Sequence, residues 1–128
     1  MFSLKKEERL SSFRRIKALF KEGDCFLVYP LSVRYLYRKG SGKVSVLIVS
    51  PKRYHKLAVE RNRIKRLIRE SYRLNNKNLK NFAGQNSVDI DLSVTFVSKD
   101  MILYKETEAK MNDVFRILCE KIEKCLSE

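Results

Sequence analysis

The chain has little or none of several residue types on which common protein classes depend. Among its 128 residues there are no tryptophans, four glycines, two prolines, three cysteines and a single histidine. No apolar run approaches the roughly 18 residues of a membrane-spanning helix, and the first residues lack the apolar stretch of a signal peptide. The four glycines form no glycine-rich phosphate loop. We therefore expect neither a membrane protein nor a secreted one.

The cysteines and the histidine argue against a metal centre and against a nucleophilic enzyme. Cys25, Cys119 and Cys125 cannot all pair within one chain, and no two of them have the spacing of zinc ligands. Free thiols in the reducing cytoplasm are expected. A Ser-His-Asp or Cys-His site would have to use His55, whose basic neighbours disfavour the imidazolium form. The sequence thus predicts no catalytic residue and no metal ligand.

Positive charge is concentrated in the middle of the chain. The formal net charge is +13, and residues 51–81 alone carry eleven basic side chains against two acidic ones. Residues 82–128 have the opposite balance, with six basic and nine acidic side chains. Because charge of one sign destabilises a fold by self-repulsion, a partner of the opposite sign is expected. The phosphates of a nucleic acid fit this requirement best.

The apolar pattern predicts a single α/β (α+β) domain over residues 1–128. Alternating or β-branched runs predict strands near 31–38, 43–50 and 88–97, with the strand at 43–50 in the centre of the sheet; a short strand around 25–29 is weakly indicated. Periodicity predicts helices from Ser11 or Ser12 to Glu22 with Gly23 as the stop, over 58–74, and from about Tyr104 onward. The polar stretch 75–87 is predicted to be a loop. This order is typical of a small sandwich whose sheet is covered on one side.

The segment 51–73 combines an apolar stripe with a dense cationic face. At about 100° per residue, the two kinds of residue fall in opposite sectors of a helix. The apolar sector holds Leu57, Ile64, Leu67, Ile68 and Ser71, and the other holds Arg61, Asn62, Lys65, Arg66, Arg69 and Arg73. A solvated surface helix would mix the signs, and a membrane-surface helix would expose the stripe that the core needs. We predict that Ile64, Leu67 and Ile68 pack on the sheet while the opposite face binds phosphates.

The run Arg61-Asn62-Arg63-Ile64-Lys65-Arg66-Leu67-Ile68-Arg69-Glu70 resembles the Arg-Asn-Arg signature helix of the bacterial ribonuclease P protein subunit. The likeness covers nearly the whole chain, through the segments Leu4-Lys5-Lys6, Phe20-Lys21-Glu22-Gly23, Lys52-Arg53, Ala58-Val59 and Asp89-Ile90-Asp91-Leu92. Two departures are visible. Residues 54–57 lack the glycine usual in the family and are one residue longer, and Ile16 replaces one of two phenylalanines on the first helix.

The resemblance implies a fold and a function. The family's protein subunit binds a large catalytic RNA, and the complex removes the 5′ leader of precursor tRNA by endonucleolytic hydrolysis, with no further protein partner required. The magnesium ions are held by the RNA subunit and the substrate, so the protein is the non-catalytic subunit of an endoribonuclease. The implied fold has a central mixed sheet with a left-handed β-α-β crossover, an exception to the usual right-handed rule.

Two sets of candidate residues follow from the basic helix and the resemblance. The RNA-binding set is Lys52, Arg53, Lys56, Arg61, Asn62, Arg63, Lys65, Arg66, Arg69 and Arg73. The leader-binding set is Phe13, Ile16, Phe20, Tyr35, Lys52 and Arg53, because a single strand is best held by a basic groove with aromatic platforms. A plain core role for Phe20 and Tyr35 stays open.

Two other functions remain as alternatives. A structural RNA-binding protein, such as a ribosomal protein, would share the basic patch but would need no cleft for a single strand. A stand-alone nuclease would need a cluster of acidic metal ligands. Asp89 and Asp91 share one strand face, and we expect them to face solvent instead of forming a metal pair.

Overall fold

The structure, a computed structural model, describes residues 8–127 and contains a four-stranded sheet and four helices. The segment Leu4-Lys5-Lys6, part of the family resemblance, lies outside the described residues. The elements in chain order are α1 (Phe13–Glu22), β1 (Asp24–Val28), β2 (Leu31–Lys39), β3 (Val44–Val49), α2 (Ala58–Asn75), α3 (Lys77–Gln85), β4 (Val88–Phe96) and α4 (Tyr104–Leu126). Mixed α+β architecture is confirmed, and so is the weakly indicated first strand.

The sheet is mixed, with the strand order β1-β2-β4-β3. β2 pairs antiparallel with both β1 and β4, whereas β3 pairs parallel with β4. The prediction that the strand at 43–50 is central was wrong, because β3 lies at an edge. Its outer side is partly covered by the chain before α1, where the Leu10 backbone N–H donates to the Val46 carbonyl at 2.9 Å. Because its outer side is covered, this edge strand can have the apolar composition that is typical of a buried strand.

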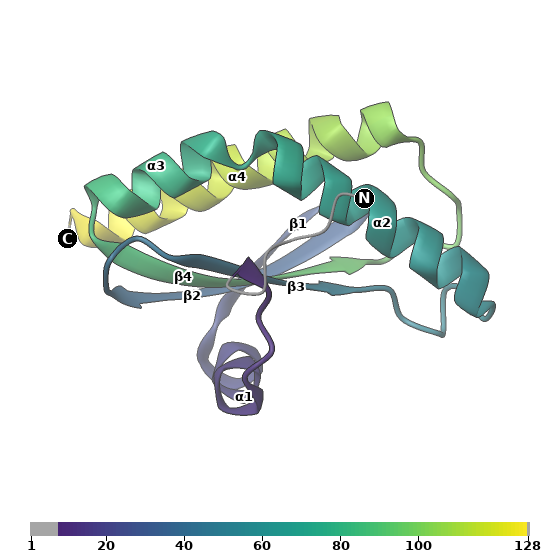
Figure 1. The fold of residues 1–128 in the computed structure, drawn as a ribbon, viewed down its shortest axis with the longest axis horizontal. Helices are drawn as coiled ribbons and strands as arrows, with labels where there is room; N and C mark the ends of the chain where they lie inside the picture. Colours follow the sequence, from purple (N-terminus) through teal and green to yellow (C-terminus); the bar gives the residue numbers. More distant parts are fainter. Residues whose placement is uncertain (1–7, 128) are drawn as a thin grey trace.

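Helices lie on both faces of the sheet (Figure 1). α2, α3 and α4 cover one face, and α1 lies against the other. The main core lies under the three helices, where buried residues of α2 and α4 such as Ile68 and Leu118 meet Leu92 and Val94 of β4. The expectation of a sheet covered on one side only was therefore wrong. The second face is partly covered by one short helix, and this asymmetry shapes the candidate site.

α1 begins and ends where the sequence predicts. The Ser12 hydroxyl accepts a hydrogen bond from the Arg15 backbone N–H at 3.4 Å and caps the helix. Gly23 follows the last turn, but with extended backbone angles (φ −71°, ψ 151°), not the left-handed conformation usual at a glycine stop. Glycine is required here for space, because a Cβ would lie 2.4 Å from the Leu19 carbonyl oxygen and 2.8 Å from that of Tyr35.

The predicted loop at 75–87 contains a helix, α3. Its Leu79 and Ala83, four residues apart, are fully buried on one side, and Phe82 packs against the core. Asparagine and lysine fill most of the remaining positions, so the apolar stripe consists of three side chains only. In this case tertiary packing outweighs weak helix propensity. Among the described residues, no helix is long and apolar enough to cross a membrane.

The close approach at Gly23 gives a paired prediction. Gly23→Ala should lower the free energy of unfolding by about 1–3 kcal/mol, because two backbone oxygens obstruct the new methyl group. Gly84→Ala, in α3, adds a methyl group that would meet nothing within 4 Å, and it should raise the free energy of unfolding by about 0.5–1 kcal/mol. Urea unfolding of both variants and the unmodified chain checks the two signs. Equal midpoints for all three would contradict the tight junction between α1 and β2.

Candidate nucleic-acid interface

α2 turns its apolar stripe to the sheet and its cations outward, as predicted. Ile64, Ile68, Ser71 and Tyr72 are fully buried, and Leu67 is half-buried against the core. Leu57, which the helical projection placed in the apolar sector, is instead 65% exposed. It has extended backbone angles and precedes the helix, so helical geometry does not apply to it. Tyr72 was missed as a core residue, and its ring packs edge-on against Phe115 with centroids 5.8 Å apart.

Most cations of α2 have no acidic partner. Among the described residues, no carboxylate lies within 4.0 Å of the charged groups of Arg63, Lys65, Arg66 or Arg69. Asn62, Arg63 and Arg66 are exposed, and Lys65 and Arg69 are half-buried. Unpaired guanidinium and ammonium groups along one helix face can each bind a phosphate oxygen. This face has the chemistry of a polyanion-binding surface.

Two cations of α2, Arg61 and Arg73, bond to groups within the protein. The Arg61 guanidinium donates to the carbonyls of His55 at 3.0 Å and Lys56 at 2.7 Å. Arg73 pairs with Glu70 at 3.4 Å, one turn earlier in the helix. Part of the hydrogen-bonding capacity of Arg61 therefore holds the turn before α2. Helical projection could not reveal this role, because it depends on the path of the preceding loop.

The turn before α2 presents further cations. Lys52, Arg53 and Lys56 are exposed. His55, in contrast, is buried against Phe96, and its Nε2 lies 2.8 Å from the Ser98 carbonyl oxygen. The only histidine of the chain thus anchors the turn to the end of β4. Residues 54–57, which lack the glycine expected from the family resemblance, are fixed by this anchor and by Arg61.

The opposite face of the sheet, beside α1, combines an exposed aromatic ring with a cation. Phe20 is 45% exposed, and the Arg34 guanidinium carbon lies 5.5 Å from the centre of its ring. The same guanidinium donates to the Phe20 carbonyl at 3.3 Å. Strand pairing places Cys25 opposite Arg34 on β1 and Ser93 opposite it on β4, so the three side chains share one face of the sheet. Phe13 is 79% exposed and Ile16 is half-buried on α1.

Tyr35 does not lie on this face. It is 4% exposed and belongs to the main core on the α4 side, where its ring meets Phe26 with centroids 6.0 Å apart. Burial, with Asp24 and Cys125 nearby, raises the pKa of Tyr35 to about 12. Since successive strand residues point to opposite faces, the side chain that faces α1 is that of its neighbour Arg34. The structure thus separates Tyr35 from Phe20, with which the sequence analysis grouped it.

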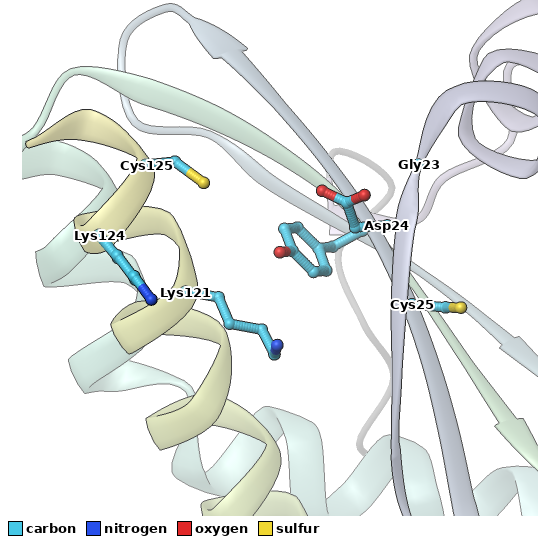
Figure 2. A pocket seen from close by; sticks show the side chains of 7 residues that line it. Gly23, Asp24, Cys25, Lys121, Lys124 and Cys125 are labelled. Carbon is cyan, nitrogen blue, oxygen red and sulfur yellow. The ribbon is translucent and has the colours of Figure 1, made fainter. Parts of the chain in front are cut away.

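A pocket of about 540 Å³ lies between β1 and the end of α4. Figure 2 shows Lys121, Lys124 and Cys125 reaching into it from α4, whereas the Cys25 sulfur points away from it. All three cysteines are free, as expected. The charges that line the pocket are mixed, since Asp24 lies there together with Lys121 and Lys124. The pocket therefore lacks the single-sign character of the α2 face.

Asp89 and Asp91, the carboxylates considered as a metal pair, are both engaged within the protein. One oxygen of Asp89 accepts the backbone N–H groups of Ser41, Gly42 and Lys43 at 2.9–3.1 Å. Asp91 is 1% exposed and pairs with Arg15 and Arg38, so the expectation that it faces solvent was wrong. Among the described residues, no three histidine, cysteine, aspartate or glutamate side chains are grouped so that they could hold a metal ion.

A groove of about 210 Å³ at the β3 edge lies between the two cationic surfaces. It is lined by Arg9–Ser11, by Val46–Ile48 of β3 and by Arg69 of α2. Arginines therefore flank the edge strand on both sides. The cationic character of α2 continues toward the chain that leads into α1.

Comparisons with known proteins bear on the family and the fold. The family model described as Ribonuclease P matches residues 4–126. The ribonuclease P protein component of Porphyromonas gingivalis is 37% identical over 114 residues, which cover 86% of this chain and 82% of that protein. That of Dictyoglomus thermophilum is 35% identical over 111 residues, 80% of this chain and 88% of the relative. The fold resembles that of the Staphylococcus aureus RNase P protein, with a TM-score of 0.67 and 23% identity over 88% of this chain and 96% of that one.

The hydrogen bonds of Asp89 predict a pH-dependent contribution to stability. Three backbone donors, that of Lys43 foremost, hold the pKa of Asp89 below its ordinary value, and nearby Arg38 acts in the same direction. Because the folded pKa is depressed, the contribution is present above the unfolded pKa of about 4 and is lost as the pH falls through the folded pKa. Asp89→Asn should cost about 1 kcal/mol at neutral pH. Urea unfolding across pH, with Asp113→Asn as the surface control, checks this; a cost that does not shrink in acid would contradict it.

Proposed function

The chain belongs to the ribonuclease P protein family, and we propose that it acts as the protein subunit that binds the catalytic RNA and the 5′ leader of precursor tRNA in the cytoplasm. In this proposal the complex removes the leader by magnesium-dependent endonucleolytic hydrolysis, and the reaction takes place in the RNA. The observation that carries the proposal is the pair of distinct cationic surfaces, one on α2 and one beside α1.

The α2 face fits the backbone of a structured RNA. Its cations lie on a helix that is packed by Ile64 and Ile68, and most of them pair with no carboxylate of residues 8–127. From Arg61 to Arg73 the helix rises about 18 Å, which spans several phosphates. We assign this face, with the exposed Lys52, Arg53 and Lys56 of the preceding turn, to the catalytic RNA.

The face beside α1 fits a single strand. An exposed Phe20 ring with Arg34 across it offers stacking and a positive charge at one place, and base stacking on aromatic rings tolerates any sequence. The neighbouring sheet surface carries the half-buried polar side chains of Ser32, Arg34 and Thr95 on one side of β2 and β4. We assign this face to the leader, with Arg34 in the place that the sequence analysis gave to Tyr35.

The residues that the structure describes do not fit a magnesium site of their own. The two strand carboxylates, Asp89 and Asp91, are bonded to backbone N–H groups and to arginines respectively. We therefore assign the magnesium ions to the RNA and the substrate. The contribution of the protein is to bind and orient RNA, and its cations lower the repulsion between two RNA molecules that must approach each other.

Cleavage of a leader-bearing precursor tRNA at low magnesium concentration tests the proposal. The protein alone, a cognate catalytic RNA alone, and the two together are compared. We expect cleavage at the mature 5′ end only when both are present. Cleavage by the protein alone would indicate a stand-alone nuclease, and no stimulation of the RNA would favour a structural RNA-binding protein.

The double variant Lys65→Ala/Arg69→Ala should weaken binding to the catalytic RNA. Each lost phosphate contact removes about 0.7–0.9 from the slope of log affinity against log salt, so the slope should flatten by about 1.5. These two cations are chosen because Arg61 also holds the turn before α2. Lys105→Ala/Arg116→Ala on α4 removes the same charge elsewhere and is the control. Equal losses of RNA affinity in both double variants would show that net charge, and not the α2 face, determines binding.

Phe20→Ala should weaken binding of leader-bearing precursor tRNA to the reconstituted holoenzyme. The loss of one stacking platform, worth roughly 1–3 kcal/mol, corresponds to about a 5- to 150-fold loss of affinity. Affinity for mature tRNA should not change, because mature tRNA has no leader. Leu103→Ala, which truncates another exposed apolar side chain just before α4, is the control. Equal losses for precursor and mature tRNA would remove Phe20 from the leader site.

A further inference from the structure

A buried carboxylate lies beneath α1. Asp91 of β4 is 1% exposed, and the Arg15 Nε donates to its Oδ2 at 3.1 Å while the Arg15 Nη2 donates to its Oδ1. The Arg38 Nη1 donates to Oδ2 at 3.1 Å, and Arg15 also reaches the Ser45 hydroxyl at 3.2 Å. One side chain of α1 is thereby bonded to two strands of the sheet.

The ion pair is a large part of what holds α1 in place. A ten-residue helix is marginal without tertiary contacts. Leu19 is its only fully buried side chain, and Phe13 and Phe20 remain exposed. A second polar contact, from Arg34 to the Phe20 carbonyl, holds the other end of the helix. α1 is thus attached by an arginine contact near each end, by the buried Leu19 and by the half-buried Ile16 and Ala18.

We propose that Asp91 is a positioning residue for the leader site: through Arg15 it holds α1 against the sheet, and so places the Phe20 ring beside Arg34. This inference rests on the proposed function, because it assigns a role within the same leader-binding face. Asp91 is buried under the helix and is not expected to contact RNA itself. Its effect is exerted through the helix that forms one wall of that face.

Removal of the Asp91 charge distinguishes a positioning role from a purely electrostatic one, because the two roles predict changes of opposite sign in the affinity for RNA. Asp91→Asn deletes a negative charge and releases two arginines, so electrostatics alone would tighten binding to RNA and steepen its salt dependence. Loss of positioning has the opposite effect, because a helix that is docked only part of the time lowers the apparent affinity by that fraction. If α1 is docked about one tenth of the time, precursor affinity falls about tenfold.

The experiment measures the affinity of the reconstituted holoenzyme for precursor and mature tRNA. Asp91→Asn should bind precursor about tenfold more weakly, with unchanged affinity for mature tRNA and for the catalytic RNA. Asp113→Asn, the same charge change on the outer side of α4, should leave all three affinities near those of the unmodified protein. Tighter or unchanged precursor binding by Asp91→Asn would overturn the proposal.

A double-mutant cycle tests whether Asp91 acts through Arg15. Should Asp91→Asn fail to fold, Arg15→Gln on the half-exposed α1 tests the same proposal. This single variant should also weaken the binding of precursor tRNA and leave the binding of mature tRNA unchanged. The double variant Arg15→Gln/Asp91→Asn, which restores the original net charge, should bind precursor no more weakly than Arg15→Gln. Additive losses would overturn the proposal. If the unmodified holoenzyme itself does not prefer precursor to mature tRNA, the proposed leader site fails instead, independently of Asp91.

Discussion

Burial of Ile64 and Ile68 against the sheet fixes the rotation of α2 about its axis, and this rotation determines where the positive charge of the chain is displayed. With those two side chains inward, Lys65, Arg66 and Arg69 must face outward together. Such a concentration of like charge opposes folding, and the apolar contacts on the other side of the same helix offset it. The cations are held ready on a rigid element, so little conformational freedom is lost when a phosphate backbone binds.

The two cationic surfaces are built on different physical principles. α2 packs over an apolar stripe, with α4 alongside, whereas α1 is attached mainly by Arg15, Arg34 and Leu19. Elements with few buried apolar contacts open at lower free energy than the core. The surface assigned to the catalytic RNA is therefore the more rigid one. The surface assigned to the leader depends on these few contacts for the placement of α1.

The sequence was most informative where one periodic signal decided the outcome and least informative where partners are distant in the chain. The helical period of α2 predicted its orientation correctly, because every apolar contact repeats on one side. The β-branched run of β3 was misinterpreted as central, since Leu10 covers its edge in a way that no local pattern reveals. Alternation places Tyr35 and Arg34 on opposite faces, but which face α1 covers depends on the ion pair between Arg15 and Asp91, 76 positions apart.

The assignment of one RNA to each face can be tested most directly by crosslinking from a native side chain. Cys25 is exposed and lies opposite Arg34 on the α1 face, so a photoreactive group can be attached there in a Cys119→Ser/Cys125→Ser background. A group at Arg66→Cys, in the variant that also lacks Cys25, reports on the α2 face. In the complex with catalytic RNA and precursor tRNA, the account predicts crosslinks from position 25 to leader nucleotides and from position 66 to the catalytic RNA. Crosslinks from position 25 to the catalytic RNA alone, or from position 66 to the leader, would contradict it.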